Sequence, residues 1–204
     1  KLAGSELERL KKLRLDHLRV DLIPAEKNFA AKLRRAANQA TALDVVLHVA
    51  LRLGEDTVAE LKGASAAAKN IGPPVAMWFI MGADQNQLQL AREILFNVSS
   101  GAFFGAPHDG ISFTELNRER PSKQMMEVVA YNITPQIHAS DNASIVETLP
   151  IQGDTVRSTR QFIGNAPLVI SPITFHTALP GNDPLPGELP WYVDARQTSL
   201  FAAG

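Results

Sequence analysis

The stretch GISFTELNRERP (110–121) concentrates groups that could carry out chemistry at the end of an apolar run. If the chain is extended here, Glu115 and Asn117 share one side, because side chains alternate along a strand. A carboxylate serves as a base or nucleophile, and an amide donates a hydrogen bond to an oxyanion or a sugar hydroxyl. Arg118 and Arg120 would keep Glu115 ionised by charge proximity. The alternative is a solvated polar turn that the final proline ends.

The run VVAYNITPQIH ends in a second group of polar residues. His138 is a candidate proton shuttle, since an imidazole titrates near neutral pH. Asn132, Thr134 and Gln136 alternate on one side of the run and offer neutral donors and acceptors that suit a polyol. The alternative for the histidine is a structural role, in which a loop carbonyl satisfies its ring.

Arg19 and Asp21 lie two residues apart in HLRVDL, so a strand would place them on one face. Inside a barrel they would form a buried pair at the mouth, which either orients a substrate or only supports the structure. The remaining histidines are scattered without HExxH or HxH spacing, and the chain has no cysteine. We therefore predict no metal site and no cofactor.

Apolar periodicity alternates along the chain between the repeats of helices and strands. It predicts helices at 5–16, 24–43, 55–71, 86–98 and 143–163. It predicts strands at 17–23, 44–53, 74–82, 102–116, 125–138 and 167–175. Such alternation indicates βαβ units, a mostly parallel sheet and the α/β fold class. Trp78 lies in the most apolar of these strands and is expected in the core.

Two α/β architectures fit this alternation: an open doubly wound sheet with a nucleotide in its crevice, and a (β/α)8 TIM barrel. No GxGxxG or GxxxxGK[ST] stretch follows a predicted strand, so the nucleotide-binding sheet lacks its fingerprint. Polar residues gather instead at the carboxyl ends of several strands, which meet at one mouth in a barrel. They are Asp21, Asp84, Glu115, Asn117, Asn132 to His138, Ser171 and Thr174. We therefore predict a barrel.

The predicted barrel is truncated, since the chain carries about six of the eight βα units. We expect a single incomplete domain over residues 1–204, with a first and a last strand outside it. Both ends suggest an internal fragment, because the chain opens on Lys1 and Asp194 begins a helix that has only just started.

Charge and composition restrict the partners that we expect. Lys and Arg number 20 against 21 Asp and Glu, which argues against a nucleic-acid partner or a polybasic membrane protein. No apolar run reaches the roughly 18–20 residues that span a bilayer, and no signal peptide opens the chain. We expect a cytoplasmic protein that binds a small molecule, with no nucleic acid and no membrane.

Six blocks of the chain together resemble the D-apionate lactonase family of bacterial apiose catabolism. They are HLRVDL, FTELNRERP, YNITPQIHASDNASIVETL, VRSTRQF, VISPITF and PGELPWYVDARQTSLFAAG. Their combination is far more specific than any single block, and it covers essentially the whole chain. The resemblance implies a TIM barrel similar to that of retaining glycoside hydrolases. It also implies hydrolysis of the ester of D-apionolactone, a branched five-membered sugar lactone, to D-apionate.

The resemblance places candidate site residues in matching blocks. Glu115 and Asn117 occupy ELNR, His138 occupies PQ-x-H, and Arg19 and Asp21 occupy RVD. Their roles are inferred from residue type.

The mechanism that we infer uses two carboxylates, Glu115 and a glutamate from a last strand beyond the chain. One activates water or attacks the lactone carbonyl, and the other, or His138, protonates the leaving ring oxygen. Asn117 and Asn132 would steady the oxyanion. The predicted catalytic residues are Glu115 and His138, and the predicted substrate-binding residues are Asn117, Asn132, Gln136, Arg19 and Asp21.

Two departures from the family pattern keep other functions open. The loop after VISPITF reads HTALPGNDP, where an arginine-containing, Asn-rich loop is expected, and GAPHDGIS stands where a more Gly-rich stretch is expected. A glycosidase with a similar barrel is the first alternative, although the Asn-Glu pair of such enzymes is absent in that order. A non-catalytic sugar-binding barrel is the second.

Overall fold

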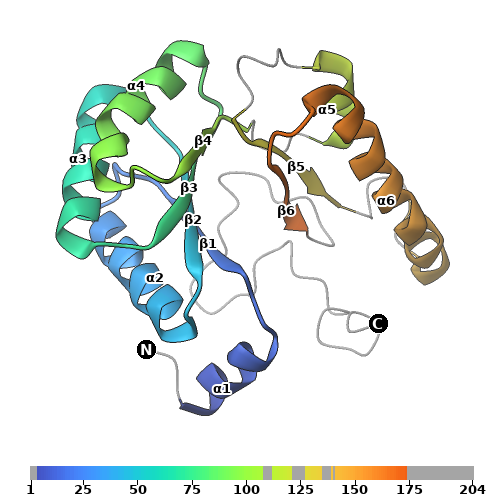
Figure 1. The fold of residues 1–204 in the computed structure, drawn as a ribbon, viewed down its shortest axis with the longest axis horizontal. Coiled ribbons are helices and arrows are strands. Elements are labelled where there is room, and N and C mark those ends of the chain that lie inside the picture. Colours follow the sequence, from blue (N-terminus) through green and yellow to red (C-terminus); the bar gives the residue numbers. More distant parts are fainter. Residues whose placement is uncertain (1–3, 108–111, 121–126, 135–138, 140, 174–204) are drawn as a thin grey trace. The chain divides into compact units, whose positions relative to one another are not determined.

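The computed structural model describes residues 4–107, 112–120, 127–134, 139 and 141–173 (Figure 1). The chain packs into two compact units, Lys1–Pro107 (unit 1) and His108–Gly204 (unit 2). Each unit combines helices with parallel strands. The expectation of one domain over 1–204 stays a prediction.

Unit 1 alternates helix and strand from its first described residue. Its elements are α1 (Gly4–Lys12), β1 (His17–Leu22), α2 (Phe29–Leu43), β2 (Val46–Leu51), α3 (Thr57–Ile71), β3 (Val75–Ile80), α4 (Gln85–Leu95), the 3-10 turn η1 (Phe96–Val98) and β4 (Phe103–Gly105). The three predicted strands at 17–23, 44–53 and 74–82 are confirmed. The predicted helices at 5–16, 55–71 and 86–98 are also confirmed, the last ending in the 3-10 turn.

The four strands of unit 1 pair in the order β1-β2-β3-β4, and every pairing is parallel. Because parallel crossovers are right-handed, a sheet that grows in one direction places each connecting helix on the same face. Figure 1 shows α2, α3 and α4 on one face of this sheet. A doubly wound sheet reverses its strand order and carries helices on both faces. The topology of unit 1 therefore favours the predicted barrel.

Alternate strand residues pack under the helices of unit 1. Leu47, Val49 and Leu51 of β2 are fully buried in this core. Trp78 of β3 is 1% exposed in the same core, as predicted, and its indole nitrogen donates to Ser99 Oγ at 2.6 Å.

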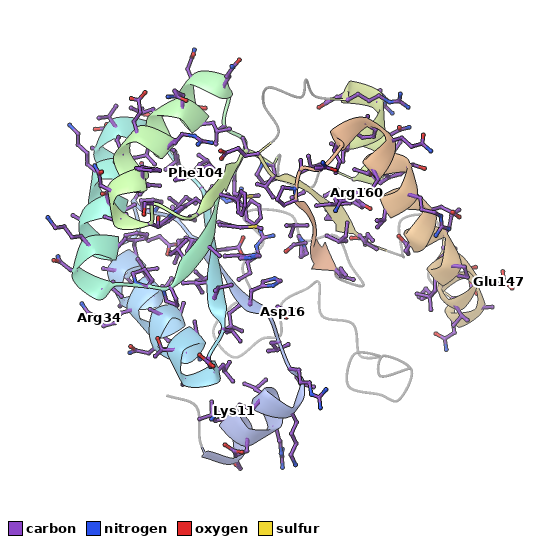
Figure 2. All side chains as sticks on the ribbon, in the orientation of Figure 1. Lys11, Asp16, Arg34, Phe104, Glu147 and Arg160 are labelled. Atoms are coloured by element: carbon purple, nitrogen blue, oxygen red, sulfur yellow. The ribbon has the colours of Figure 1, made fainter. Side chains whose placement is uncertain are left out.

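The helix layer has an apolar inner side and a charged outer side. Figure 2 shows Phe104 of β4 beside the helices, and the Arg92 guanidinium carbon of α4 lies 5.3 Å from its ring centroid. Arg34 of α2 is exposed and points away from the sheet (Figure 2). The remaining strand residues form the face that α2, α3 and α4 leave free, called here the helix-free face. It carries His17, Arg19, Asp21, Val46, His48, Ala50, Met77, Phe79, Phe103 and Gly105.

Unit 2 contains α5 (Phe113–Glu119), β5 (Val129–Ile133), α6 (Asn142–Ile163) and β6 (Leu168–Ile173), with β5 and β6 parallel. Its core joins Val129 and Tyr131 of β5 to Leu116 of α5 and Ile163 of α6. The predicted strands at 125–138 and 167–175 are confirmed over their described cores, and so is the helix at 143–163.

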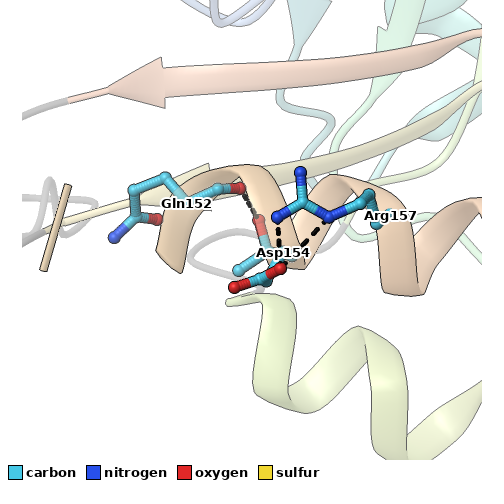
Figure 3. Close-up of polar contacts among 4 residues, drawn as sticks. Gln152, Asp154 and Arg157 are labelled. Atoms are coloured by element: carbon cyan, nitrogen blue, oxygen red, sulfur yellow. Dashed lines mark hydrogen bonds and ion pairs between the residues drawn. The ribbon is translucent and has the colours of Figure 1, made fainter. Parts of the chain in front are cut away.

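Helix α6 is tied to β5 through its middle turns. The Thr155 hydroxyl donates to the Gln152 carbonyl at 2.7 Å, and Arg157 Nε donates to Asp154 at 3.1 Å (Figure 3). The Tyr131 hydroxyl lies 2.6 Å from Thr155 Oγ1. Tyr131 is almost fully buried, so this bond satisfies a phenol that water cannot reach.

The predicted strand over 102–116 is confirmed only at its start and is wrong over residues 113–116. Strand β4 ends at Gly105, and residues 113–119 form helix α5. The Ser112 side chain accepts from the Glu115 amide, and the Glu115 side chain accepts from the Ser112 amide. This capping box satisfies two of the amides that the first turn of a helix leaves without partners.

Helix α2 begins later than predicted, at Phe29, because residues 24–28 form turns. The Glu26 amide donates to the Ile23 carbonyl at 3.0 Å, and the Phe29 amide donates to the Glu26 carbonyl at 3.0 Å. In these turns the bonds join residues three apart, so the Ile23 and Glu26 carbonyls do not accept from residues four positions later, as they would in an α-helix.

Candidate functional site

Arg19 and Asp21 form a two-pronged ion pair on the helix-free face of unit 1. Arg19 Nε donates to Asp21 Oδ2 at 3.0 Å, and Arg19 Nη2 donates to Asp21 Oδ1 at 2.7 Å. The Arg19 side chain is 18% exposed and that of Asp21 is 58% exposed. The planar fork holds both groups in a fixed orientation, while the carboxylate stays accessible at the carboxyl end of β1. The predicted pair is therefore present, but its carboxylate is exposed and not buried as expected.

His48 of β2 lies on the same face and was not among the predicted site residues. It is the ladder partner of Arg19 and is only 6% exposed. Its ring stacks on that of His17 with centroids 3.9 Å apart, and its edge meets Phe79. Burial, with the nearby His17 and Arg19 charges, lowers the pKa of His48 to about 4, so the imidazole is neutral at pH 7.

The sequence contains a signal that marks His48 as a candidate site residue, although His48 is not part of any metal-binding spacing motif. The residue interrupts an otherwise apolar strand, VLHVAL, at a position that pairs with the polar Arg19 of HLRVDL. Polar residues in register on adjacent strands lie on one face, because paired residues in a ladder point the same way.

Glu115 is the third residue of α5 and closes its capping box. Its Oε2 accepts from the Ser112 amide at 2.8 Å and lies 3.1 Å from the Ser112 hydroxyl. A carboxylate in the first turn also complements the positive end of the helix dipole. Glu115 thus has a structural role as part of a helix cap, which was not expected when the segment was predicted to be a strand. Its catalytic role stays a prediction.

Asn117 does not share a side with Glu115, which corrects the expectation from strand alternation. Both lie in α5, where two residues are separated by about 200° around the axis. The Asn117 Oδ1 accepts from Arg120 Nη2 at 3.1 Å, and its carbonyl accepts from Arg120 Nε at 3.2 Å. Arg120 thus hydrogen-bonds to Asn117, and its guanidinium also lies over the Phe162 ring. This differs from the predicted pairing of the arginine with Glu115.

The start of α5 lies beside the carboxyl-terminal part of β5. Ser112 forms a parallel bridge with Asn132. Because Val129 and Tyr131 face the helices, strand alternation turns Asn132 to the side away from them. Thr134 follows the end of β5, and within the described residues its buried hydroxyl lacks a hydrogen-bond partner. Unit 2 thus brings the Glu115 cap and the Asn132 amide to one end of β5.

Three of the predicted polar residues lie outside the described part of the chain, and the described part offers neither a metal-binding cluster nor a membrane-spanning helix. Gln136, His138 and Thr174 lie outside the described residues. Within the described ranges, no group of three or more His, Asp or Glu side chains could hold a metal ion. None of the described helices combines the length and apolar character that crossing a bilayer requires.

Comparison with known proteins identifies a family whose sequences this chain resembles. A family model described as D-apionate lactonase, TIM barrel domain, matches residues 1–204. One stretch of 62 residues is 36% identical to a D-apionate lactonase of Brucella anthropi, and it makes up 30% of this chain and 10% of that protein. The family match confirms the predicted TIM barrel class, with which the parallel strands and one-sided helices of unit 1 agree. The chain belongs to the D-apionate lactonase family, and it matches the TIM barrel domain of that family.

Proposed function

We propose that the protein hydrolyses the ester of a sugar-derived lactone, with D-apionolactone as substrate and D-apionate as product. The observation that carries this proposal is the match of residues 1–204 to the barrel domain of the lactonase family. The partial likeness to the Brucella anthropi enzyme supports the same substrate. Barrel enzymes carry their active sites at the carboxyl ends of the strands, and the polar candidates Asp21 and Asn132 lie toward such ends.

In the proposed reaction, Glu115 acts as the base and His138 as the acid. Water attacks the lactone carbonyl carbon and forms a new C–O bond, while its proton passes to Glu115. The tetrahedral intermediate then breaks the bond between this carbon and the ring oxygen, which takes a proton from His138. The product is an open-chain carboxylic acid with one new hydroxyl group. The acid ionises at neutral pH, so each turnover releases a proton.

Neutral and charged donors would hold the lactone. The Asn132 amide is proposed to donate to the carbonyl oxygen as it becomes an oxyanion, which strengthens the bond in the transition state. Gln136 and the Arg19–Asp21 pair are proposed to bind the sugar hydroxyls. Asn117 stays a proposed substrate contact, although its Oδ1 already accepts from Arg120.

The proposal is tested by the acid that the full-length protein releases from D-apionolactone, measured at constant pH against a blank without protein. The blank matters because lactones also hydrolyse spontaneously. A chelator is added in a parallel run, and aryl glycosides serve as competing substrates. We expect acid release above the blank, no effect of the chelator, and no phenol from the glycosides.

Two results would contradict the proposal in different ways. Phenol release without lactone hydrolysis would indicate the glycosidase alternative. Saturable binding of the lactone or of D-apionate without any turnover would indicate the non-catalytic sugar-binding barrel.

A further inference from the structure

His48 is a buried polar residue that the proposed reaction does not use. It lies in the middle of β2 and points to the helix-free face, because its neighbours Leu47 and Val49 point into the helix-covered core. In the parallel ladder its partner is Arg19, whose side chain points to the same face. The Arg19–Asp21 pair and the His48 ring are therefore neighbours across two strands.

The contacts of His48 hold its ring but leave its nitrogens open to a ligand. The flat side of the ring stacks on His17, and the edge of Phe79 approaches it with ring centroids 6.0 Å apart. Across the ranges that the structure describes, neither ring nitrogen has a hydrogen-bond partner. Within the same ranges, Thr134 Oγ1 is the only fully buried side-chain nitrogen or oxygen without a partner, so the unbonded His48 nitrogens keep access to solvent or to a ligand.

The charge state of His48 restricts the ligand group that it could bind. A neutral imidazole has one N–H donor and one bare nitrogen acceptor. A hydroxyl group matches both, since it donates and accepts. A carboxylate would pair with only the donor, and the neighbouring Arg19 offers it a stronger charged partner. The chemistry of the site therefore fits a hydroxylated ligand at His48.

We propose that His48 binds a hydroxyl group of the sugar lactone beside the Arg19–Asp21 pair and thereby contributes to the choice of substrate. This inference rests on the proposed function for the identity of the ligand. His48 on β2 would then determine specificity together with Arg19 and Asp21 on β1.

A purely structural histidine is the competing explanation, and two substitutions separate the explanations. His48→Phe keeps a ring that can stack on His17 and meet Phe79, but it removes both hydrogen-bonding nitrogens. His48→Gln loses the ring but keeps a donor and an acceptor. The matched control is His17→Phe, which changes a histidine to the same residue at the exposed position of the stack.

The experiment measures the Kd of D-apionate by calorimetry, and the KM and kcat for D-apionolactone, on the full-length protein. We expect His48→Phe to raise Kd and KM at least tenfold, His48→Gln to recover part of this loss, and His17→Phe to stay within about twofold of wild type. Unchanged Kd and KM in a folded His48→Phe variant would overturn the proposal.

A second measurement on the wild type decides the matter if the variants do not fold. Nitrogen-15 NMR of labelled histidines reports the hydrogen bonding of each ring nitrogen, and we expect the His48 signals to shift on saturation with D-apionate. Signals that stay unchanged in the saturated protein would overturn the proposal, as would the absence of saturable D-apionate binding. Binding without lactone turnover would remove the proposed function and leave the His48 contact supported.

Discussion

The carboxylate of Glu115 accepts from the amide of Ser112 at 2.8 Å, and this bond begins helix α5. Ser112 in turn bridges to Asn132 of β5. The residue that we propose as the base is therefore part of the cap that fixes α5 beside β5. Any substitution of Glu115 has to be judged for its effect on this cap as well as on the chemistry.

Ser112→Ala should destabilise α5, and it also removes the hydroxyl that lies 3.1 Å from Glu115 Oε2. The serine hydroxyl accepts from the Glu115 amide at 3.4 Å, and loss of such an N-cap lowers the free energy of unfolding by about 1 kcal/mol. Thermal unfolding of the full-length protein, followed by circular dichroism, measures the change. Ser112→Asp is the matched control, because aspartate is an equally good N-cap. If the alanine and aspartate variants unfold at the same temperature, the cap contributes no stability.

Arg19→Lys should impair substrate binding more than stability. Lysine keeps the charge but cannot form the two-pronged contact with Asp21, so we expect KM to rise about tenfold. The Asp21 side chain is largely exposed, and ion pairs of this kind contribute about 1 kcal/mol or less. Steady-state kinetics and thermal unfolding of the same preparation compare the two effects. A drop in unfolding temperature with unchanged KM would assign the pair a structural role.

His48 should make the fold less stable in acid. Its pKa falls from 6.5 to about 4 in the folded protein, so the unfolded chain binds more protons between these values. The free energy of unfolding therefore rises as pH increases from 4 to 6.5, by at most about 3 kcal/mol, since one pH unit corresponds to about 1.4 kcal/mol. The charged and titratable groups around it on the described part of this face are His17, Arg19 and Asp21.

The pH effect of His48 is measured as the difference in unfolding temperature between His48→Phe and wild type from pH 4 to 7. We expect the variant to gain relative stability as the pH falls, because phenylalanine takes up no proton. A difference that does not vary with pH would contradict the neutral, buried state of His48.

Ser99→Ala should weaken the core of unit 1. The Trp78 indole N–H donates to the Ser99 hydroxyl at 2.6 Å, and the tryptophan is 1% exposed. Removal of the acceptor leaves a buried donor without a partner, which lowers the free energy of unfolding by about 1–3 kcal/mol. Denaturant unfolding followed by tryptophan fluorescence tests this, with Ser99→Thr as a control that keeps the hydroxyl. An alanine variant as stable as wild type would mean that water replaces the serine.

The sequence predicts the fold of this chain well where apolar periodicity is strong. HLRVDL and PVAMWFIMG have the alternation or the continuous apolar run of buried strands, and both are strands. Helix α5 was missed because its seven residues are too short for periodicity to distinguish from a strand. The pattern S-x-x-E at Ser112 and Glu115 was the available signal, since it is typical of a capping box.

The candidate site is harder to predict because caps and ligand contacts use the same residue types. Asp84 also follows a strand, and the structure uses it as the N-cap of α4, with its side chain accepting from the Gln87 amide at 2.8 Å. Asp21 also lies toward a strand end but pairs with Arg19 on the sheet instead. His48 was missed because its neighbours on the adjacent strand become visible only once the ladder register is known.

The most direct test of the proposed reaction is the kcat for D-apionolactone of full-length Glu115→Gln beside wild type. Glutamine is accepted at the third position of a capping box, so this substitution keeps α5 while removing the base. We predict that kcat falls by about 10²–10⁴, with an unfolding temperature close to that of wild type. Wild-type turnover by the folded variant would contradict the account and leave Glu115 with its capping role alone.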